Sequence, residues 1–97
     1  MARKYLRISE VVRICGVDSR FIKRLEEEQL ISCVIRRREK YYRLDQVDRV
    51  RVARVLIEDM GVNLEGAEVV LNMREQMISM QRQFRELLTL LGRQARR

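Results

Sequence analysis

The stretch ISEVVRICGVDSRFIKRLEEEQL, residues 8–30, decides the fold because it encodes two short helices separated by a tight turn. Ser9 is a candidate N-cap for the first helix, and Gly16 is a candidate left-handed residue that ends it. Asp18 can cap a second helix over residues 19–29. Two capped helices joined by a glycine-containing turn are typical of a helix-turn-helix motif.

The apolar residues of this stretch predict which faces of the two helices are buried. In the second helix, Ile22 and Leu25 lie three residues apart, and Leu30 continues the pattern. The expected apolar face of the first helix consists of Val11, Val12, Ile14 and Cys15.

Residues 31–43 change character and predict a two-stranded wing. The sequence CVI at 33–35 favours a strand, RRREK at 36–40 forms a charged tip, and YYR at 41–43 again favours a strand. The tip lacks the Gly or Asn that tight hairpins prefer, so the type of turn stays open. Tyr41 and Tyr42 point to opposite faces of a strand, and we therefore expect one of them in the core.

Two further helices follow the wing. Asp45 can cap the third helix, which ends at Gly61, and Asn63 can cap a last helix that runs towards Gly92. The apolar stripe expected on the third helix consists of Val47, Val50, Ala53, Leu56, Ile57 and Met60.

The last helix has the clearest periodicity in the chain. Its apolar residues alternate between spacings of three and four, which is the pattern of a coiled-coil seam. The seam consists of Val70, Met73, Met77, Met80, Phe84, Leu87 and Leu91. Its first turns can fold back on the head, but the whole seam spans about 30 Å, more than so small a head can cover. We therefore expect a homodimer joined by this helix, in parallel or antiparallel orientation, with a head over residues 1–62 and a dimerisation helix over 63–97.

Composition limits the classes of function. The chain has 97 residues, enough for one small domain, and 21 Lys and Arg against 14 Asp and Glu give a formal net charge of +7. This charge favours a polyanionic partner such as nucleic acid. There is no His, and the two cysteines, Cys15 and Cys33, are isolated, so the sequence predicts neither an enzyme nor a metal or cofactor site.

The sequence also predicts where the protein works. No apolar stretch approaches the roughly 18 residues of a membrane span, and the first residues lack the apolar segment of a signal peptide. Two unpaired cysteines fit a reducing compartment. We therefore expect a cytoplasmic protein without a membrane partner.

Four segments resemble the MerR family of regulators. LRISEVVRICGVD at 6–18 resembles the family's opening, EQLI at 28–31 its entry to the wing, and YYRLDQV at 41–47 its exit from the wing. MGVNLEGAEVVL at 60–71 is similar to HspR-like repressors of chaperone genes and to CbpM-like chaperone modulators. The resemblance implies a mainly α fold, in which a MerR-like winged helix-turn-helix head with a two-stranded wing precedes a long C-terminal coiled-coil helix.

The two groups of relatives imply two different functions. HspR-like proteins are transcriptional regulators, which implies a dimer that binds double-stranded DNA at a dyad-symmetric operator. CbpM-like proteins bind the J-domain of a DnaJ-type co-chaperone and inhibit it. Operator sequence, effector, and activation or repression are left open.

One departure from the family bears on this choice. DNA binders of the family carry Arg-Tyr-Tyr in the second helix, whereas this chain has KRL at 23–25, so the contact of those tyrosines with phosphate does not carry over. Glu26, Glu27 and Glu28 follow at once and would repel phosphate if they faced it. These differences suit the chaperone modulator, whose basic surface would face an acidic partner.

The basic residues nevertheless favour the DNA-binding regulator. The early residues of the second helix would enter the major groove, and the wing would contact flanking phosphates. The alternatives are ion pairs of the helix residues with Glu27 and Glu28, and a solvated wing edge that prevents aggregation. The candidate DNA-binding residues are Ser19, Arg20, Lys23, Arg24, Arg36, Arg37, Arg38, Lys40, Tyr41 and Tyr42.

Overall fold

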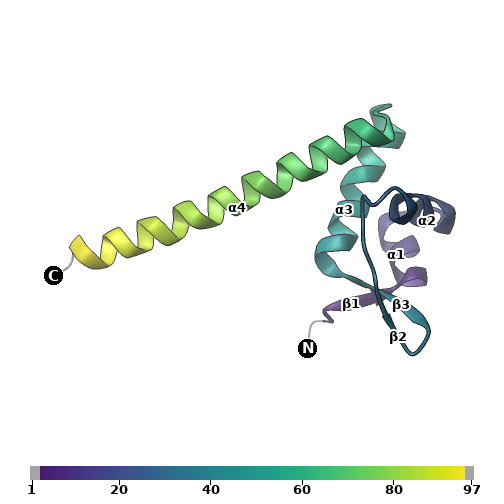
Figure 1. The fold of residues 1–97 in the computed structure, drawn as a ribbon, viewed down its shortest axis with the longest axis horizontal. Coiled ribbons are helices and arrows are strands. Elements are labelled where there is room, and N and C mark those ends of the chain that lie inside the picture. Colours follow the sequence, from purple (N-terminus) through teal and green to yellow (C-terminus); the bar gives the residue numbers. More distant parts are fainter. Residues whose placement is uncertain (1–2, 96–97) are drawn as a thin grey trace.

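The computed structural model describes residues 3–95 of the chain and has a small head from which one long helix projects (Figure 1). This arrangement confirms the predicted fold class, a mainly α chain with a winged helix-turn-helix head. In order, the elements are β1 (Tyr5–Arg7), α1 (Ile8–Cys15), α2 (Ser19–Glu27), β2 (Val34–Arg36), β3 (Glu39–Arg43), α3 (Leu44–Arg54), the π-helical turn η1 (Val55–Asp59) and α4 (Leu64–Ala95).

The turn between α1 and α2 follows the prediction. Gly16 adopts a left-handed conformation with φ of 65°, and its N–H donates to the carbonyl oxygen of Val12 at 3.0 Å. The side chain of Asp18 accepts a hydrogen bond from the N–H of Arg20 at 2.7 Å and so caps α2. Both caps depend only on local chemistry, which is why the sequence revealed them.

The start of α1 differs from the prediction. The helix begins at Ile8, so Ser9 lies inside its first turn and the prediction that Ser9 is the N-cap was wrong. The carboxylate of Glu10 reaches back instead and accepts a hydrogen bond from the N–H of Arg7 at 3.0 Å. An acid in the first turn of a helix is also favoured by the helix dipole.

The sheet has three strands, in the order β1-β3-β2, and both pairs are antiparallel. The sequence predicted only β2 and β3. Strand β1 pairs Leu6 with Tyr42, but at three residues it is too short to show a repeating alternation. A two-residue turn joins β2 to β3, and both of its residues, Arg37 and Arg38, are left-handed, with φ of 52° and 67°.

The core lies between the helices and the inner face of the sheet. Two residues expected in it are exposed, Ile14 by 58% and Met60 by 65%. Ile14 lies about 100° around α1 from Cys15, beyond the buried face. Met60 follows η1, where its N–H donates to the carbonyl oxygen of Val55, and this wider turn shifts the phase of the apolar stripe. The buried apolar residues are Leu6, Val11, Cys15, Val17, Ile22, Leu25, Leu30, Ile31, Tyr42, Val47, Val50, Ala53, Leu56, Ala67 and Leu71.

Helix α4 starts on the head and then leaves it. The side chain of Asn63 caps the helix as predicted, because it accepts a hydrogen bond from the N–H of Gly66 at 2.7 Å. Ala67 and Leu71 are buried, so the first two turns pack against the head. Beyond Leu71 every residue of the predicted seam with a described side chain is exposed, by 50% or more from Met73 to Leu91. The division of the chain after residue 62 stays a prediction.

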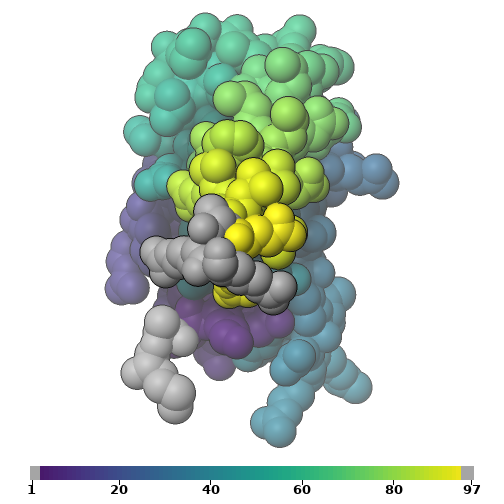
Figure 2. All heavy atoms as spheres, turned by 90° about the vertical axis from the view of Figure 1, so that its left-hand side faces the viewer, coloured from purple at the N-terminus to yellow at the C-terminus, as the bar shows by residue number. Residues whose placement is uncertain are grey.

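Figure 2 views the molecule along α4, whose C-terminal part faces the viewer in front of the head. The wing extends from the head at the lower right of this view. Among the described residues, no helix combines the length and the apolar character that a membrane span requires.

Candidate nucleic-acid interface

Helix α2 has one buried face and one basic face. Ile22 and Leu25 are fully buried and fix the helix against the head. Each of the predicted contact residues of this helix is exposed, on the side turned away from the core. These residues are Ser19, Arg20, Lys23 and Arg24.

The Arg20 side chain already has an acidic partner at the start of α2. Its guanidinium group forms an ion pair with Asp18, with 3.1 Å between Nη2 and Oδ2. The hydrogen bonds from the side chain and the backbone of Arg20 lower the pKa of the Asp18 carboxyl. Because the Arg20 side chain is 89% exposed, water competes for this pair and the guanidinium can exchange it for a phosphate.

The wing tip presents four exposed basic residues, Arg36, Arg37, Arg38 and Lys40. Two of them occupy left-handed positions, which Asn-Gly normally fills in a two-residue turn of this kind. A residue with a side chain pays about 1 kcal/mol or more in that region. The chain therefore keeps arginine at the tip at a cost in stability, as functional sites commonly do.

The carboxylate of Glu26 joins α2 to the wing. It accepts hydrogen bonds from the hydroxyl group of Tyr42 and from the ammonium group of Lys40, the second at 2.9 Å. The Glu26 side chain is only 15% exposed, and its charge is matched by Lys40. Of the three acids expected to repel phosphate, Glu26 is thus neutralised within the head, whereas Glu27 and Glu28 remain exposed.

The prediction that Tyr42 contacts DNA was wrong. Tyr42 is fully buried, which meets the expectation that one of the two tyrosines is in the core. Burial and the hydrogen bond to Glu26 raise the pKa of its hydroxyl group, which therefore stays protonated. A buried hydroxyl that already donates to a carboxylate cannot reach a phosphate of a bound duplex.

Tyr41 lies on the other face of β3, half-buried, and its hydroxyl donates to Glu39 at 3.0 Å. The guanidinium of Arg7 lies over its ring, 5.9 Å from the centroid. On the same outer face, the guanidinium of Arg36 lies 5.7 Å from the ring centroid of Tyr5. Tyr5 and Arg7 were not among the predicted residues, because a strand of three residues carries too little alternation to be recognised from the sequence.

The described part of the chain contains no group of three or more His, Cys, Asp or Glu side chains that could hold a metal ion. Burial raises the pKa of the thiol groups of Cys15 and Cys33, so both are held as thiols.

Two helices joined by a tight turn, followed by a basic antiparallel hairpin, define a winged helix-turn-helix protein. The chain belongs to the MerR HTH family of regulatory proteins, because the model of that family matches residues 6–89. The match extends from β1 to well into α4 and confirms the resemblance to the MerR family. A search of curated proteins found no match. At the level of this family, which is not one of enzymes, the protein is a DNA-binding regulator.

Proposed function

We propose that the protein is a cytoplasmic HspR-type regulator that binds a dyad-symmetric operator as a homodimer. The observation that carries this proposal is the bridge at Glu26, which holds the basic wing beside the C-terminal part of α2. Both elements that Glu26 joins carry exposed basic side chains, at positions 20, 23 and 24 in α2 and at 36–38 in the wing. A helix that reads the major groove and a wing that contacts flanking phosphate is the arrangement expected of this class.

Each element has a distinct role in the proposal. The exposed side chains of Ser19, Arg20, Lys23 and Arg24 face the bases and the nearest phosphates. The wing arginines contact the backbone and fix the register of the helix without reading sequence. The left-handed conformations of Arg37 and Arg38 support this role, because stability alone would favour other residues there.

The exposed seam of α4 supports the homodimer. Met73, Met77 and Phe84 are exposed by 56%, 61% and 61%, and they lie on one side of a helix that has left the head. A stripe of this length in water favours a second apolar surface. A second copy offers the same heptad pattern, so each seam side chain can insert between those of the partner helix.

The residues beside the seam favour antiparallel pairing. Val69 and Leu90 are exposed and flank the two ends of the seam, with glutamines between them at 76 and 83. If Val70 lies opposite Leu87 of the second copy, Val69 faces Leu90 and Gln76 faces Gln83. Parallel pairing would place Val69 beside Arg74 instead. Flanking positions set orientation in coiled coils, and here the antiparallel choice avoids placing the apolar Val69 beside a charged residue.

The test is a fluorescence-anisotropy titration against the protein's own promoter region and a scrambled duplex, across a salt series. We expect promoter-selective binding that weakens steeply with salt. The variant Arg37→Ala/Arg38→Ala should lower affinity for both duplexes and reduce the salt slope by about two, one for each lost phosphate contact. Its control, Arg82→Ala/Arg93→Ala, removes the same charge from α4 away from the seam and should bind like the wild type.

The same titration includes the J-domain of a DnaJ-type co-chaperone. Equal, weak binding to both duplexes together with tight binding to the J-domain would overturn the proposal. The basic head would then be a protein-recognition surface, as in CbpM-like modulators.

A further inference from the structure

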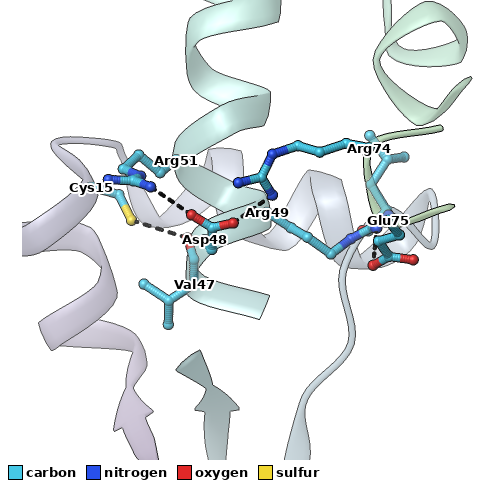
Figure 3. A network of polar contacts seen from close by, with 8 residues as sticks. Cys15, Val47, Asp48, Arg49, Arg51, Arg74 and Glu75 are labelled. Carbon is cyan, nitrogen blue, oxygen red and sulfur yellow. Dashed lines mark hydrogen bonds and ion pairs between the residues drawn. The ribbon is translucent and has the colours of Figure 1, made fainter. Parts of the chain in front are cut away.

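Two ion pairs of opposite polarity join α3 to α4. The carboxylate of Asp48 contacts Arg74, with 2.6 Å between Oδ2 and Nη1, and Arg49 contacts Glu75, with 2.5 Å between Nη1 and Oε1 (Figure 3). Along α3 the acid Asp48 precedes the base Arg49. Along α4 the order is reversed, and Arg74 precedes Glu75. We call these four residues the joint.

The geometry of the joint restricts how α4 can move. Neighbouring residues on a helix point about 100° apart, so the two pairs hold α4 from two directions. A shift of α4 by one residue in either direction would break both ion pairs and bring like charges together at one of them, Asp48 with Glu75 or Arg49 with Arg74. The joint therefore defines both the rotation of α4 about its own axis and its axial position relative to the head.

Arg49 also connects the joint to the recognition helix. Its Nε donates to the carbonyl oxygen of Leu30 at 2.7 Å, and the N–H of Leu30 donates to Leu25 in α2 at 2.8 Å. At 7% exposure, Arg49 is the only buried charged residue in the described part of the chain. One side chain thus contacts the segment that ends α2 and, through Glu75, the helix that carries the seam.

Stability alone does not explain this arrangement. Burying a guanidinium group carries a desolvation penalty, and well-packed apolar residues in place of a buried ion pair are often as stable or more stable. The best-attested use of such groups is to specify one geometry among several. The Glu75 side chain is 56% exposed, so water competes for this contact and reduces what it adds to stability.

We propose that the joint sets the separation of the two recognition helices in the dimer and so determines the spacing between operator half-sites. This inference rests on the proposed function. The described part of the chain extends 34 Å along its second principal axis. A rotation of about 10° at the joint moves a group about 20 Å away by about 3.5 Å, close to the rise of ~3.4 Å per base pair. Small changes at these four residues would therefore change the preferred spacing by a whole base pair.

The experiment removes both α4 partners without changing net charge. Arg74→Ala/Glu75→Ala is compared with the matched control Arg82→Ala/Glu86→Ala, which makes the same replacements further along α4. A conservative variant, Arg74→Lys/Glu75→Gln, keeps a donor and an acceptor at the two positions. Each protein is titrated against operators whose central spacer is lengthened or shortened by one or two base pairs.

We expect the wild type, the control and the conservative variant to prefer one spacer length at least tenfold over its neighbours. In the alanine variant that preference should fall to about threefold or move by a base pair, with an unchanged salt slope. A variant that loses affinity equally for all spacers, or keeps the wild-type preference, would overturn the inference. The single variant Arg74→Ala, which leaves the buried Arg49 paired, covers the case in which the double variant does not fold.

A second measurement does not depend on DNA. Spin labels at Arg38→Cys, in a Cys33→Ser background, report the distance between the two heads of the free dimer. The distance distribution should be narrow in the wild type and broad in the alanine variant. Equal widths overturn the role of the joint, whereas a wild type that is monomeric or does not select its promoter overturns the proposed function instead.

Discussion

The hydroxyl group of Tyr42 and the ammonium group of Lys40 share one acceptor, the carboxylate of Glu26. A strand of the wing and the recognition helix are therefore joined through a single side chain, sixteen residues from Tyr42 in the sequence. A substitution that breaks this bridge should therefore lower both the affinity for DNA and the free energy of unfolding of the head.

Removal of the Tyr42 hydroxyl should destabilise the head. Tyr42→Phe keeps the buried ring but takes one donor from Glu26, and we expect a loss of about 1–2 kcal/mol in the free energy of unfolding. Urea denaturation measures the loss. The control is Tyr41→Phe, because the Tyr41 hydroxyl bonds to the exposed Glu39 and should contribute less than about 0.5 kcal/mol. Equal effects of the two variants would contradict a special role for the bridge.

Replacement of the wing turn should weaken DNA binding and raise the free energy of unfolding. Arg37→Asn/Arg38→Gly places the preferred residues at two left-handed positions, and we expect a gain of about 1–2 kcal/mol in the free energy of unfolding. The same variant should bind operator DNA more weakly, because two phosphate contacts are lost. Arg36→Asn, which removes a charge from extended backbone, should weaken binding without stabilising the head. A turn variant that binds as well as the wild type would mean that the tip does not contact DNA.

A charge in the seam should separate the dimer. Met77→Lys places an ammonium group in the centre of the proposed interface, and sedimentation equilibrium should show a monomer that keeps its helical head. Ser79→Lys, on the opposite side of α4, adds the same charge and should remain dimeric. If both variants stay dimeric, the seam is not the interface.

Orientation can be tested with cysteines at the flanking positions. Val69→Cys/Leu90→Cys should form a covalent dimer on mild oxidation if the helices are antiparallel with Val69 opposite Leu90 of the second copy. Neither single variant should do so. Cross-linking of Val69→Cys/Arg74→Cys, with none in Val69→Cys/Leu90→Cys, would indicate parallel helices.

The contact of Asp48 with Arg74 should depend on pH in a defined direction. Partial burial opposes ionisation of Asp48, but hydrogen bonds from Arg74 and Arg51 outweigh it and lower its pKa below the usual 3.8. The stabilisation is then fully present above pH 3.8 and is lost as the pH falls through the lowered pKa. Asp48→Asn should cost up to about 1 kcal/mol at pH 7, since the site is partly solvated, and the difference from the wild type should shrink near pH 3. A difference that is constant from pH 7 to pH 3 would exclude this electrostatic contribution.

Local chemistry explains what could be predicted from the sequence. Gly16, Asp18 and Asn63 end or begin helices through contacts within four residues, so their roles could be recognised without the fold. Ser9 was misplaced because Glu10 offers a competing cap one residue later. Met60 was misplaced because a π-helical turn breaks the helical phase on which the stripe was counted.

Contacts distant in sequence explain the rest. Alternation put Tyr41 and Tyr42 on opposite faces of a strand, but only the position of α2 decides which of them meets Glu26. Arg49 looked like one of many surface arginines, and its burial depends on Leu30 and Glu75, which lie 19 and 26 residues away. The candidate interface could therefore be predicted as a set of basic residues, and the contacts that hold it together could not.

In the proposed homodimer, the seam of α4 would tie the lifetime of the protein to its abundance. In a single copy, α4 beyond Leu71 contacts the head through Arg74 and Glu75, while the seam from Met73 to Leu91 stays exposed. Past this joint, the backbone hydrogen bonds of the helix would gain protection when the proposed second copy is bound. At low concentration the open, fraying helix is a substrate for proteases, and at high concentration mass action closes it. A cell that makes little of this protein would then degrade it quickly. Operator occupancy would change more steeply with the rate of synthesis than affinity for the operator alone would allow.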